Sequence, residues 1–334
     1  MDILWETLAF VVKVVVVVVA VATGVALVAS RSRDEEPVPG RLVVRRLNDL
    51  FRLRKAELSV ALLPPGAQKK ALGKARKEEK ENAERSQARN VFVLDFKGDL
   101  LASAVEDLRE IITAVIAVAA PDDEVVVRLE SGGGAVPHYG LAASQLQRLR
   151  AHRIRLVVCI DRIAASGGYM MACVADSIVA APFAIIGSIG VAAPVPNVHR
   201  LLQRVGVDYE DATAGEYKRT VTLLGEITPQ GRKKFQAQLD ETHDLFKGFV
   251  QRNRPSLDIE RVATGEHWLG ERALELELVN ELMTSDDYLM RAYDEANVFA
   301  LEYRRPKSLR ERVTATVQAT WLGALAGVPA SWRS

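Results

Sequence analysis

The chain has 334 residues, enough for one sizeable domain with appendages or for two small domains. Its 49% hydrophobic and 26% charged residues are typical of a globular protein and argue against a disordered or fibrous chain. The net charge of +1 hides an asymmetry, because residues 31–90 carry 16 Lys and Arg against 9 Asp and Glu, whereas the residues from 91 onward carry 27 against 32. A basic excess beside an apolar segment favours a role at a membrane surface over nucleic-acid binding.

The apolar segment runs from Leu8 to Ala29 and is 22 residues long, which is enough to span the hydrocarbon core of a bilayer. The alternative is a cleaved signal peptide, whose apolar region is usually shorter and ends in a small-x-small site. Because Leu27-Val28-Ala29 fits such a site poorly, we expect an uncleaved, single-pass anchor within residues 1–30, in the inner membrane. Arginines follow the segment closely and none precedes it, so the positive-inside rule favours a cytoplasmic position for the rest of the chain.

Two charged regions flank the expected domain. Residues 31–90 are predicted to form a charged connector, helical in part or disordered, between the anchor and the domain. Residues 301–334 form a basic amphipathic tail, which could lie on the membrane surface or dock on the domain or on a neighbouring subunit. Its apolar residues recur at every fourth position, at Leu309, Val313, Val317, Trp321 and Leu325.

Residues 91–300 are predicted to form the folded domain. Apolar, β-branched runs alternate with segments of helical period, which predicts an α/β fold with largely parallel strands. The predicted strands are Val91–Phe96, Val125–Leu129, Leu156–Ile160 and Ile178–Ala181. The predicted helices are Leu101–Ala120, His138–Arg150, one that begins near Ser166, Pro229–Arg252, Ile259–Thr264 and Glu271–Leu278.

Ser166 follows a predicted strand, opens a helix and is followed by two glycines. The ordinary interpretation is a helix N-cap serine, which is very common. The alternative is a nucleophile at a helix N-terminus, where backbone N–H groups can hold a developing oxyanion. Taken alone, the motif leaves the N-cap interpretation ahead.

A run of three glycines, Gly132–Gly134, follows Ser131 at the end of another predicted strand. One interpretation is a phosphate cradle, but the run lacks the Lys-Ser/Thr of a P-loop. A second is an oxyanion-hole loop, in which Gly133 and Gly167 each contribute a backbone N–H. A third is a simple turn, and the residues themselves leave these interpretations open.

Lys218 lies 52 positions after Ser166. A lone lysine is usually solvated surface. A buried lysine can instead act as a general base, because desolvation disfavours its ammonium form, and Ser–Lys pairs are a known variant of the serine-protease arrangement. Ser188 is a polar residue in an apolar run and needs a hydrogen-bond partner if it is buried, which an amine base would be.

The cysteines and histidines show no metal-ligand spacing. Cys159 and Cys173 lie in apolar surroundings, where buried free thiols are the default. The five histidines are scattered along the chain, so the sequence predicts neither a metal site nor a cofactor.

Six short motifs together resemble those of the signal peptide peptidase A family of membrane-anchored serine proteases. The likeness runs from Val91 to about Asp287, and the anchor, connector and basic tail fit it as well. The motifs are Val93–Gly98, Arg128–Gly134, Ala164–Ala172, Gly187–Val191, Ala214–Arg219 and Glu266–Trp268.

The resemblance implies roles for individual residues. Ser166 occupies the position of the nucleophile, Lys218 that of the general base, and Ser188 that of the serine that orients the lysine. Gly133 occupies the position whose N–H serves the oxyanion, with Gly167 as the second donor. The family usually has a proline where this chain has a glycine in the Gly132–Gly134 run.

The resemblance also implies a fold like that of the ClpP and crotonase enzymes, built from stacked β-β-α units, and a cyclic homo-oligomer in which a neighbouring protomer sometimes supplies the base. We therefore expect a membrane-anchored serine endopeptidase that cleaves extended apolar peptides, such as remnant signal peptides or unfolded membrane-protein segments. The alternatives are a non-catalytic scaffold or an acyl-CoA enzyme on the same fold, and the Ser–Lys pair argues against both.

Overall fold

The computed structural model describes residues 40–64, 67 and 89–305. Residues 42–303 form one compact unit, and the second unit, residues 1–41 and 304–334, lies almost wholly outside the described residues. The predicted anchor and nearly all of the basic tail are therefore outside the description, as is most of the connector. Among the helices that the structure does describe, none has the length and apolar character needed to cross a bilayer.

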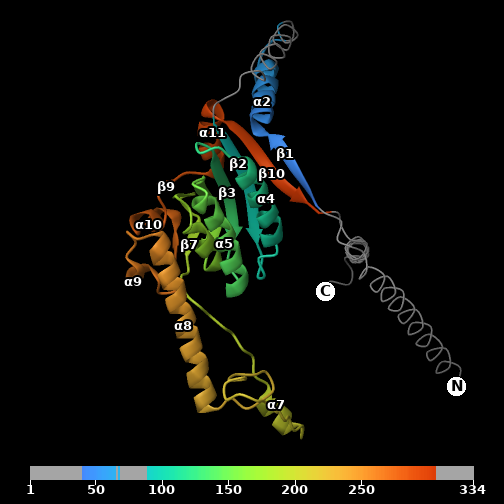
Figure 1. The fold of residues 1–334 in the computed structure, drawn as a ribbon, viewed down its shortest axis with the longest axis vertical. Helices are drawn as coiled ribbons and strands as arrows, with labels where there is room; N and C mark the ends of the chain where they lie inside the picture. Colours follow the sequence, from blue (N-terminus) through green and yellow to red (C-terminus); the bar gives the residue numbers. More distant parts are fainter. Residues whose placement is uncertain (1–39, 65–66, 68–88, 306–334) are drawn as a thin grey trace, which may run out of the picture. The chain divides into compact units, whose positions relative to one another are not determined.

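Ten strands within the described ranges form one sheet (Figure 1). The strands run in the order β1-β10-β2-β3-β4-β6-β9, while β5 pairs with β3 and β7, and β7 pairs with β8. The pairings of β2, β3, β4, β5 and β6 are parallel, whereas β7 and β8 are antiparallel. Their bounds are β1 Arg41–Arg46, β2 Asn90–Gly98, β3 Glu124–Ser131, β4 Arg155–Ile160, β5 Ile163–Ala165, β6 Ser177–Ala180, β7 Ile185–Gly187, β8 His267–Leu269, β9 Glu281–Leu282 and β10 Asn297–Arg304.

Helices cover both faces of this sheet, and their bounds are α2 Leu47–Ala61, α4 Val105–Val118, α5 Val136–Ala151, α6 Gly167–Ala172, α7 His199–Arg204, α8 Pro229–Asn253, α9 Ile259–Val262, α10 Gly270–Glu275 and α11 Ser285–Glu295. On one face Val125 and Val127 pack in the core with α4, α5 and α6. On the other face Val126 packs with Leu289 of α11. A parallel strand covered on both faces is apolar at successive positions, which is why Glu124–Ser131 contains an unbroken run of valines.

The predicted mixed α/β fold with a largely parallel sheet is confirmed. All four predicted strands are present, as β2, β3, β4 and β6, although the predicted Ile178–Ala181 runs one residue past the end of β6. Strands β1 and β10, the three-residue strands β5, β7 and β8, and the two-residue strand β9 were not among the predicted strands. A three-residue strand is too short to show a period, so its neighbours in space rather than its own sequence decide that it pairs.

Strand β1 and helix α2 lie inside the stretch for which a connector was expected. Asn48 of α2 is fully buried, and its side-chain amide donates to the carbonyls of Tyr293 (3.1 Å) and Ala296 (3.0 Å). Its side-chain oxygen accepts the N–H of Val298 at 2.7 Å. This stretch of the chain is therefore bonded to the domain through a buried polar side chain.

The segment between β7 and α8, residues 188–228, carries only the short helix α7 among its described elements. Figure 1 shows its α7 end beside the N-terminal half of α8, beyond the end of the sheet. Gln230 of α8 donates to Glu216 at 3.1 Å, and the Lys234 amine lies 5.1 Å from the centre of the Tyr217 ring. We call residues 191–228 the arm.

Candidate active site

Ser166 lies at the junction between β5 and α6 in a backbone conformation that is rare for residues other than glycine, with φ 52° and ψ −119°. Its N–H donates to the Gly187 carbonyl at 2.8 Å, and its carbonyl accepts the N–H of Met170 at 2.9 Å. Such a conformation persists only where the surrounding structure over-determines it. The Ser166 side chain makes no capping hydrogen bond, so the ordinary N-cap interpretation does not hold here.

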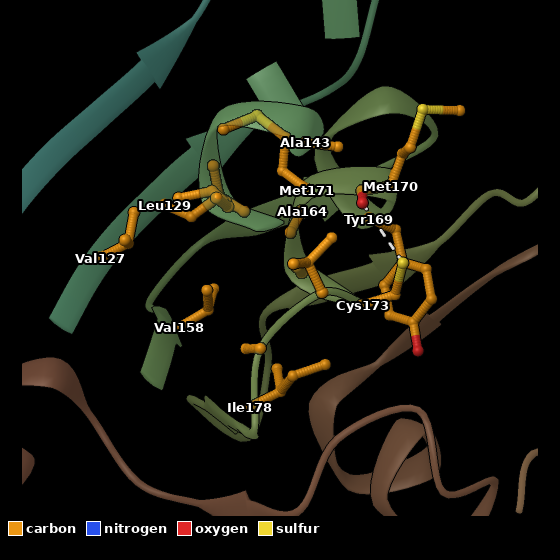
Figure 2. Packing of buried hydrophobic residues seen from close by; sticks show 14 of the residues in the cluster. Val127, Leu129, Ala143, Val158, Ala164, Tyr169, Met170, Met171, Cys173 and Ile178 are labelled. Atoms are coloured by element: carbon orange, nitrogen blue, oxygen red, sulfur yellow. Dashed lines mark hydrogen bonds between the residues drawn. The ribbon is translucent and has the colours of Figure 1, made fainter. Parts of the chain in front are cut away.

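The core holds α6 rigidly behind this serine. Tyr169, Met171 and Cys173 are fully buried. Figure 2 shows these side chains among those of Ala164 and Ile178, with a 3.2 Å hydrogen bond from the Cys173 thiol to the Met170 carbonyl. A helix this short makes few hydrogen bonds of its own, so tertiary packing rather than helix propensity fixes its position.

The glycine loop passes directly over the start of α6. Gly133 has φ +89°, and a Cβ placed on it would lie 2.7 Å from the Gly167 nitrogen and 2.7 Å from the Ser166 Cβ. A Cβ on Gly168 would lie 2.5 Å from the Ser131 carbonyl oxygen. Real Cβ atoms do not approach backbone this closely, so only glycine permits the contact. The structure thus brings Ser166, Gly133 and Gly167 together.

A buried hydroxyl pair supports this loop from beneath. The Ser131 and Tyr139 hydroxyl oxygens lie 2.6 Å apart, and Tyr139 donates to the Asp99 carbonyl at 2.7 Å. The Gly133 N–H donates to the Ser131 oxygen at 3.1 Å, so this N–H is already engaged. Burial raises the pKa of Tyr139 above its ordinary value, so the phenol stays protonated at neutral pH. Sequence reasoning missed Tyr139, because a buried tyrosine on a helix carries no local signal of a site.

A cavity of about 360 Å³ opens beside Ser166. Its walls come from the glycine loop, α5, α6, the segment after β7 and the C-terminal half of α8. Most of the lining side chains are apolar, and only Arg252 is charged. The lining includes Gly134, Val136, Tyr139, Gly140, Met170, Val191, Leu245, Phe246 and Phe249.

Ser188 directly follows the residue that accepts the Ser166 N–H. It is half-buried and has φ 51°. Its N–H donates to the Glu266 carbonyl at 2.7 Å and its carbonyl accepts the Gly190 N–H at 2.9 Å, so the backbone holds it firmly. Within the described part of the chain, its hydroxyl makes no hydrogen bond to Lys218.

Lys218 lies in the arm, and the expectation that it is buried is wrong for the single chain, because the residue is exposed. Its backbone N–H donates to Gly215 at 3.1 Å. Among the residues that the structure describes, its amine makes no hydrogen bond or ion pair with Ser166 or Ser188. The physical reason is that the arm leaves the sheet (Figure 1) and that none of its residues is buried, so nothing in the arm encloses the amine.

Both cysteines are buried and free, as predicted. Burial raises the pKa of Cys173 to about 12 and raises that of Cys159 as well, so both remain neutral thiols. In the described ranges, no three or more His, Cys, Asp or Glu side chains are grouped so that they could hold a metal ion.

Comparison with known proteins identifies the family. The model of "Peptidase family S49" matches residues 148–299, and that of "Peptidase family S49 N-terminal" matches residues 2–146. The chain is 59% identical over 219 residues to the probable protease SohB of Haemophilus influenzae, a match that covers 66% of this chain and 62% of that relative, slightly less than two thirds of its length. It is 41% identical over 324 residues to the putative protease SohB of Buchnera aphidicola subsp. Baizongia pistaciae, which covers 92% of this chain and 93% of that protein.

Among solved structures, the chain is similar to a mutant of the 1510-N membrane-bound stomatin-specific protease in complex with a substrate peptide, with a TM-score of 0.43, 15% sequence identity, and coverage of 69% of this chain and 98% of that one. The N-terminal family match includes the glycine loop, and the second match includes Ser166, Ser188 and Lys218. The chain belongs to peptidase family S49, a family of serine peptidases.

Proposed function

We propose that this chain is a membrane-anchored serine endopeptidase in which Ser166 is the nucleophile and Lys218 the general base. The observation that carries the proposal is the conformation of Ser166, whose side chain caps no helix, and which lines an apolar cavity next to Gly133 and Gly167. A serine held in a rare backbone conformation at a strand-to-helix turn suits a nucleophile, because strain of this kind concentrates at functional sites.

The chemistry follows from these groups. The neutral Lys218 amine takes the Ser166 proton, and the serine oxygen attacks the peptide carbonyl. The N–H groups of Gly167 and Gly133 stabilise the resulting oxyanion, with the Gly133 N–H shared between the oxyanion and Ser131. The leaving amine receives the proton from Lys218, and water then hydrolyses the acyl-enzyme. Ser188 orients the amine.

A cyclic homo-oligomer would complete the site. Lys218 is exposed in the single chain, so an amine from a neighbouring protomer's arm could reach Ser166 across an interface. Large apolar side chains are exposed on the arm, which is expected of a surface that an identical subunit covers. They are Val195, Leu201, Val205, Val207, Tyr217 and Leu223.

The substrates would be extended apolar peptides, such as remnant signal peptides or unfolded membrane-protein segments. The cavity beside Ser166 supports this, because Val136, Met170 and Phe249 line it and would favour an apolar side chain. The segment from Leu8 to Ala29 would hold the enzyme in the inner membrane with its domain in the cytoplasm. The domain fold would be of the ClpP and crotonase type, with stacked β-β-α units.

A fluorophosphonate probe tests the proposal directly, because it reacts only with an activated serine. The full chain in detergent should be labelled at Ser166 and should cleave an apolar fluorogenic peptide, and Ser166→Ala should lose both activities. A folded chain that is neither labelled nor active would exclude the hydrolase and leave a binding or scaffold role.

A further inference from the structure

The hydrogen bonds beneath the glycine loop run in one direction. The Asp99 carbonyl can only accept a hydrogen bond, so the Tyr139 hydroxyl must donate its one proton to it, at 2.7 Å. The 2.6 Å contact with Ser131 must therefore use the serine proton, with the tyrosine oxygen as acceptor. The Ser131 oxygen then accepts the Gly133 N–H at 3.1 Å. The result is a chain of three donors that starts at the loop backbone and ends at a carbonyl.

The hydrogen-bonded series from Gly133 to Asp99 is buried, and a glycine beside it leaves the space that it needs. Ser131 is 2% exposed and Tyr139 is fully buried. A Cβ on Gly98 would collide with both hydroxyl oxygens, so a glycine in β2 provides the space they occupy. Each hydroxyl donates its proton and accepts one hydrogen bond, so neither donor is unpaired and the proton positions are ordered.

Tyr139 also touches the other half of the site. A Cβ on Gly167 would collide with the Tyr139 ring, so the ring packs directly against the first residue of α6. The hydroxyl end of the same side chain holds Ser131, and through it Gly133. One side chain therefore contacts Gly167 directly and Gly133 through a single intermediate, and these are the two residues proposed to stabilise the oxyanion.

We propose that Tyr139, acting through Ser131, is a positioning residue that sets the Gly132–Gly134 loop against Ser166 and Gly167. The inference rests on the proposed function, since it concerns the oxyanion donors of that reaction. Oxyanion donors work only if they are placed in advance, and a displacement of about 1 Å can cost about 100-fold in rate. The loop carries three glycines in succession and cannot hold one backbone conformation by itself. A hydrogen bond from a residue outside the loop is therefore needed to fix it.

Tyr139→Phe tests whether the hydrogen bond between Tyr139 and Ser131 positions the loop. The variant keeps the ring against Gly167 and the wall of the cavity, and it removes only the hydroxyl. In the full chain, kcat should fall about 10- to 100-fold while KM stays within about twofold, because the loss falls on the transition state. Hydrogen exchange at the Gly133 amide should speed up at least about 10-fold, because its partner Ser131 is no longer held.

Ser131→Ala should reduce kcat similarly. The double variant should lose no more in kcat than the more damaging single variant, because the two hydrogen bonds act in series.

Tyr288→Phe is the matched control. Tyr288 also donates a partly buried hydroxyl, to Glu124 at 2.9 Å, but it lies on α11 at the opposite face of the sheet. Tyr288→Phe should lower the stability of the domain without changing kcat or hydrogen exchange at the Gly133 amide. An unchanged exchange rate at Gly133 in Tyr139→Phe, or a kcat within about twofold of the parent chain, overturns the proposal. If the parent chain cleaves no peptide, the proposed function fails, whereas exchange at Gly133 still decides whether Tyr139 holds the loop.

Discussion

Gly133 and Ser166 lie so close that a Cβ on Gly133 would come within 2.7 Å of the Ser166 Cβ. Both residues have left-handed backbone, with φ +89° at Gly133 and 52° at Ser166. The contact joins the end of one parallel strand to the end of another, because Ser131 of β3 pairs with Ala164 of β5. The proposed nucleophile and one proposed oxyanion donor are thus set against each other by the sheet register.

Gly133→Ala should therefore abolish most of the activity. The new methyl group must displace backbone atoms of Ala165 and Gly167, and the positive φ adds strain, so we expect a loss of at least about 100-fold in kcat/KM. Peptide cleavage by the purified variant measures this. Gly206→Ala is the matched control, because Gly206 has φ +72° but open space around it. Equal activity in the two variants would show that the contact with Ser166 does not matter.

Ser166→Ala should remove catalysis and leave stability unchanged. The Ser166 hydroxyl caps no helix, so its loss breaks no capping bond, whereas the loss of a nucleophile lowers kcat by about 10⁴-fold or more. Steady-state kinetics and thermal unfolding of the same preparation measure the two effects. Retained turnover in the variant would eliminate Ser166 as the nucleophile.

Lys218→Arg should be nearly as damaging as Lys218→Ala. Arginine keeps the positive charge but cannot be deprotonated in a protein, so it cannot accept the serine proton. Lys233→Arg, on the exposed surface of α8, is the matched control and should cleave peptide normally. If Lys218→Arg retains the rate of this control, a general-base role for Lys218 is wrong.

Mixing two inactive variants should restore activity if the site is shared between protomers. An assembly of Ser166→Ala and Lys218→Ala subunits contains some interfaces at which an intact Lys218 faces an intact Ser166. Co-expression followed by peptide cleavage and light scattering checks both the activity and the oligomer. A strictly monomeric chain that cleaves peptide at full rate would contradict the shared site.

Asn48→Ala should destabilise the domain without touching the site. Its fully buried side chain makes hydrogen bonds to Val298, Tyr293 and Ala296. The substitution leaves the Val298 N–H and the carbonyls of Tyr293 and Ala296 without these partners. The expected loss is about 1–3 kcal/mol in the free energy of unfolding, measured by urea denaturation. Ser59→Ala on the exposed part of the same helix is the control, and equal midpoints for the two variants would refute the prediction.

The parallel core strands could be predicted because their signal is local. Val125–Val127 and Leu156–Ile160 are apolar at successive positions, and a strand buried on both faces needs no other information. The edge of the sheet could not be predicted in this way. Arg41–Arg46 is charged at both ends and becomes a strand because β10 lies beside it, and β10 is more than 250 positions away in the chain.

The candidate site, like the fold, was predicted from the sequence only in part. The sequence alone was sufficient to single out Ser166, Lys218 and the glycine run, because they lie in motifs that together resemble those of a known protease family. Only the tertiary structure decided that Ser166 and Gly133 touch, that Tyr139 joins Ser131 to Asp99, and that Lys218 is exposed in the single chain. The physical reason is that a motif specifies which groups are present, whereas contact and burial depend on packing between segments far apart in the chain.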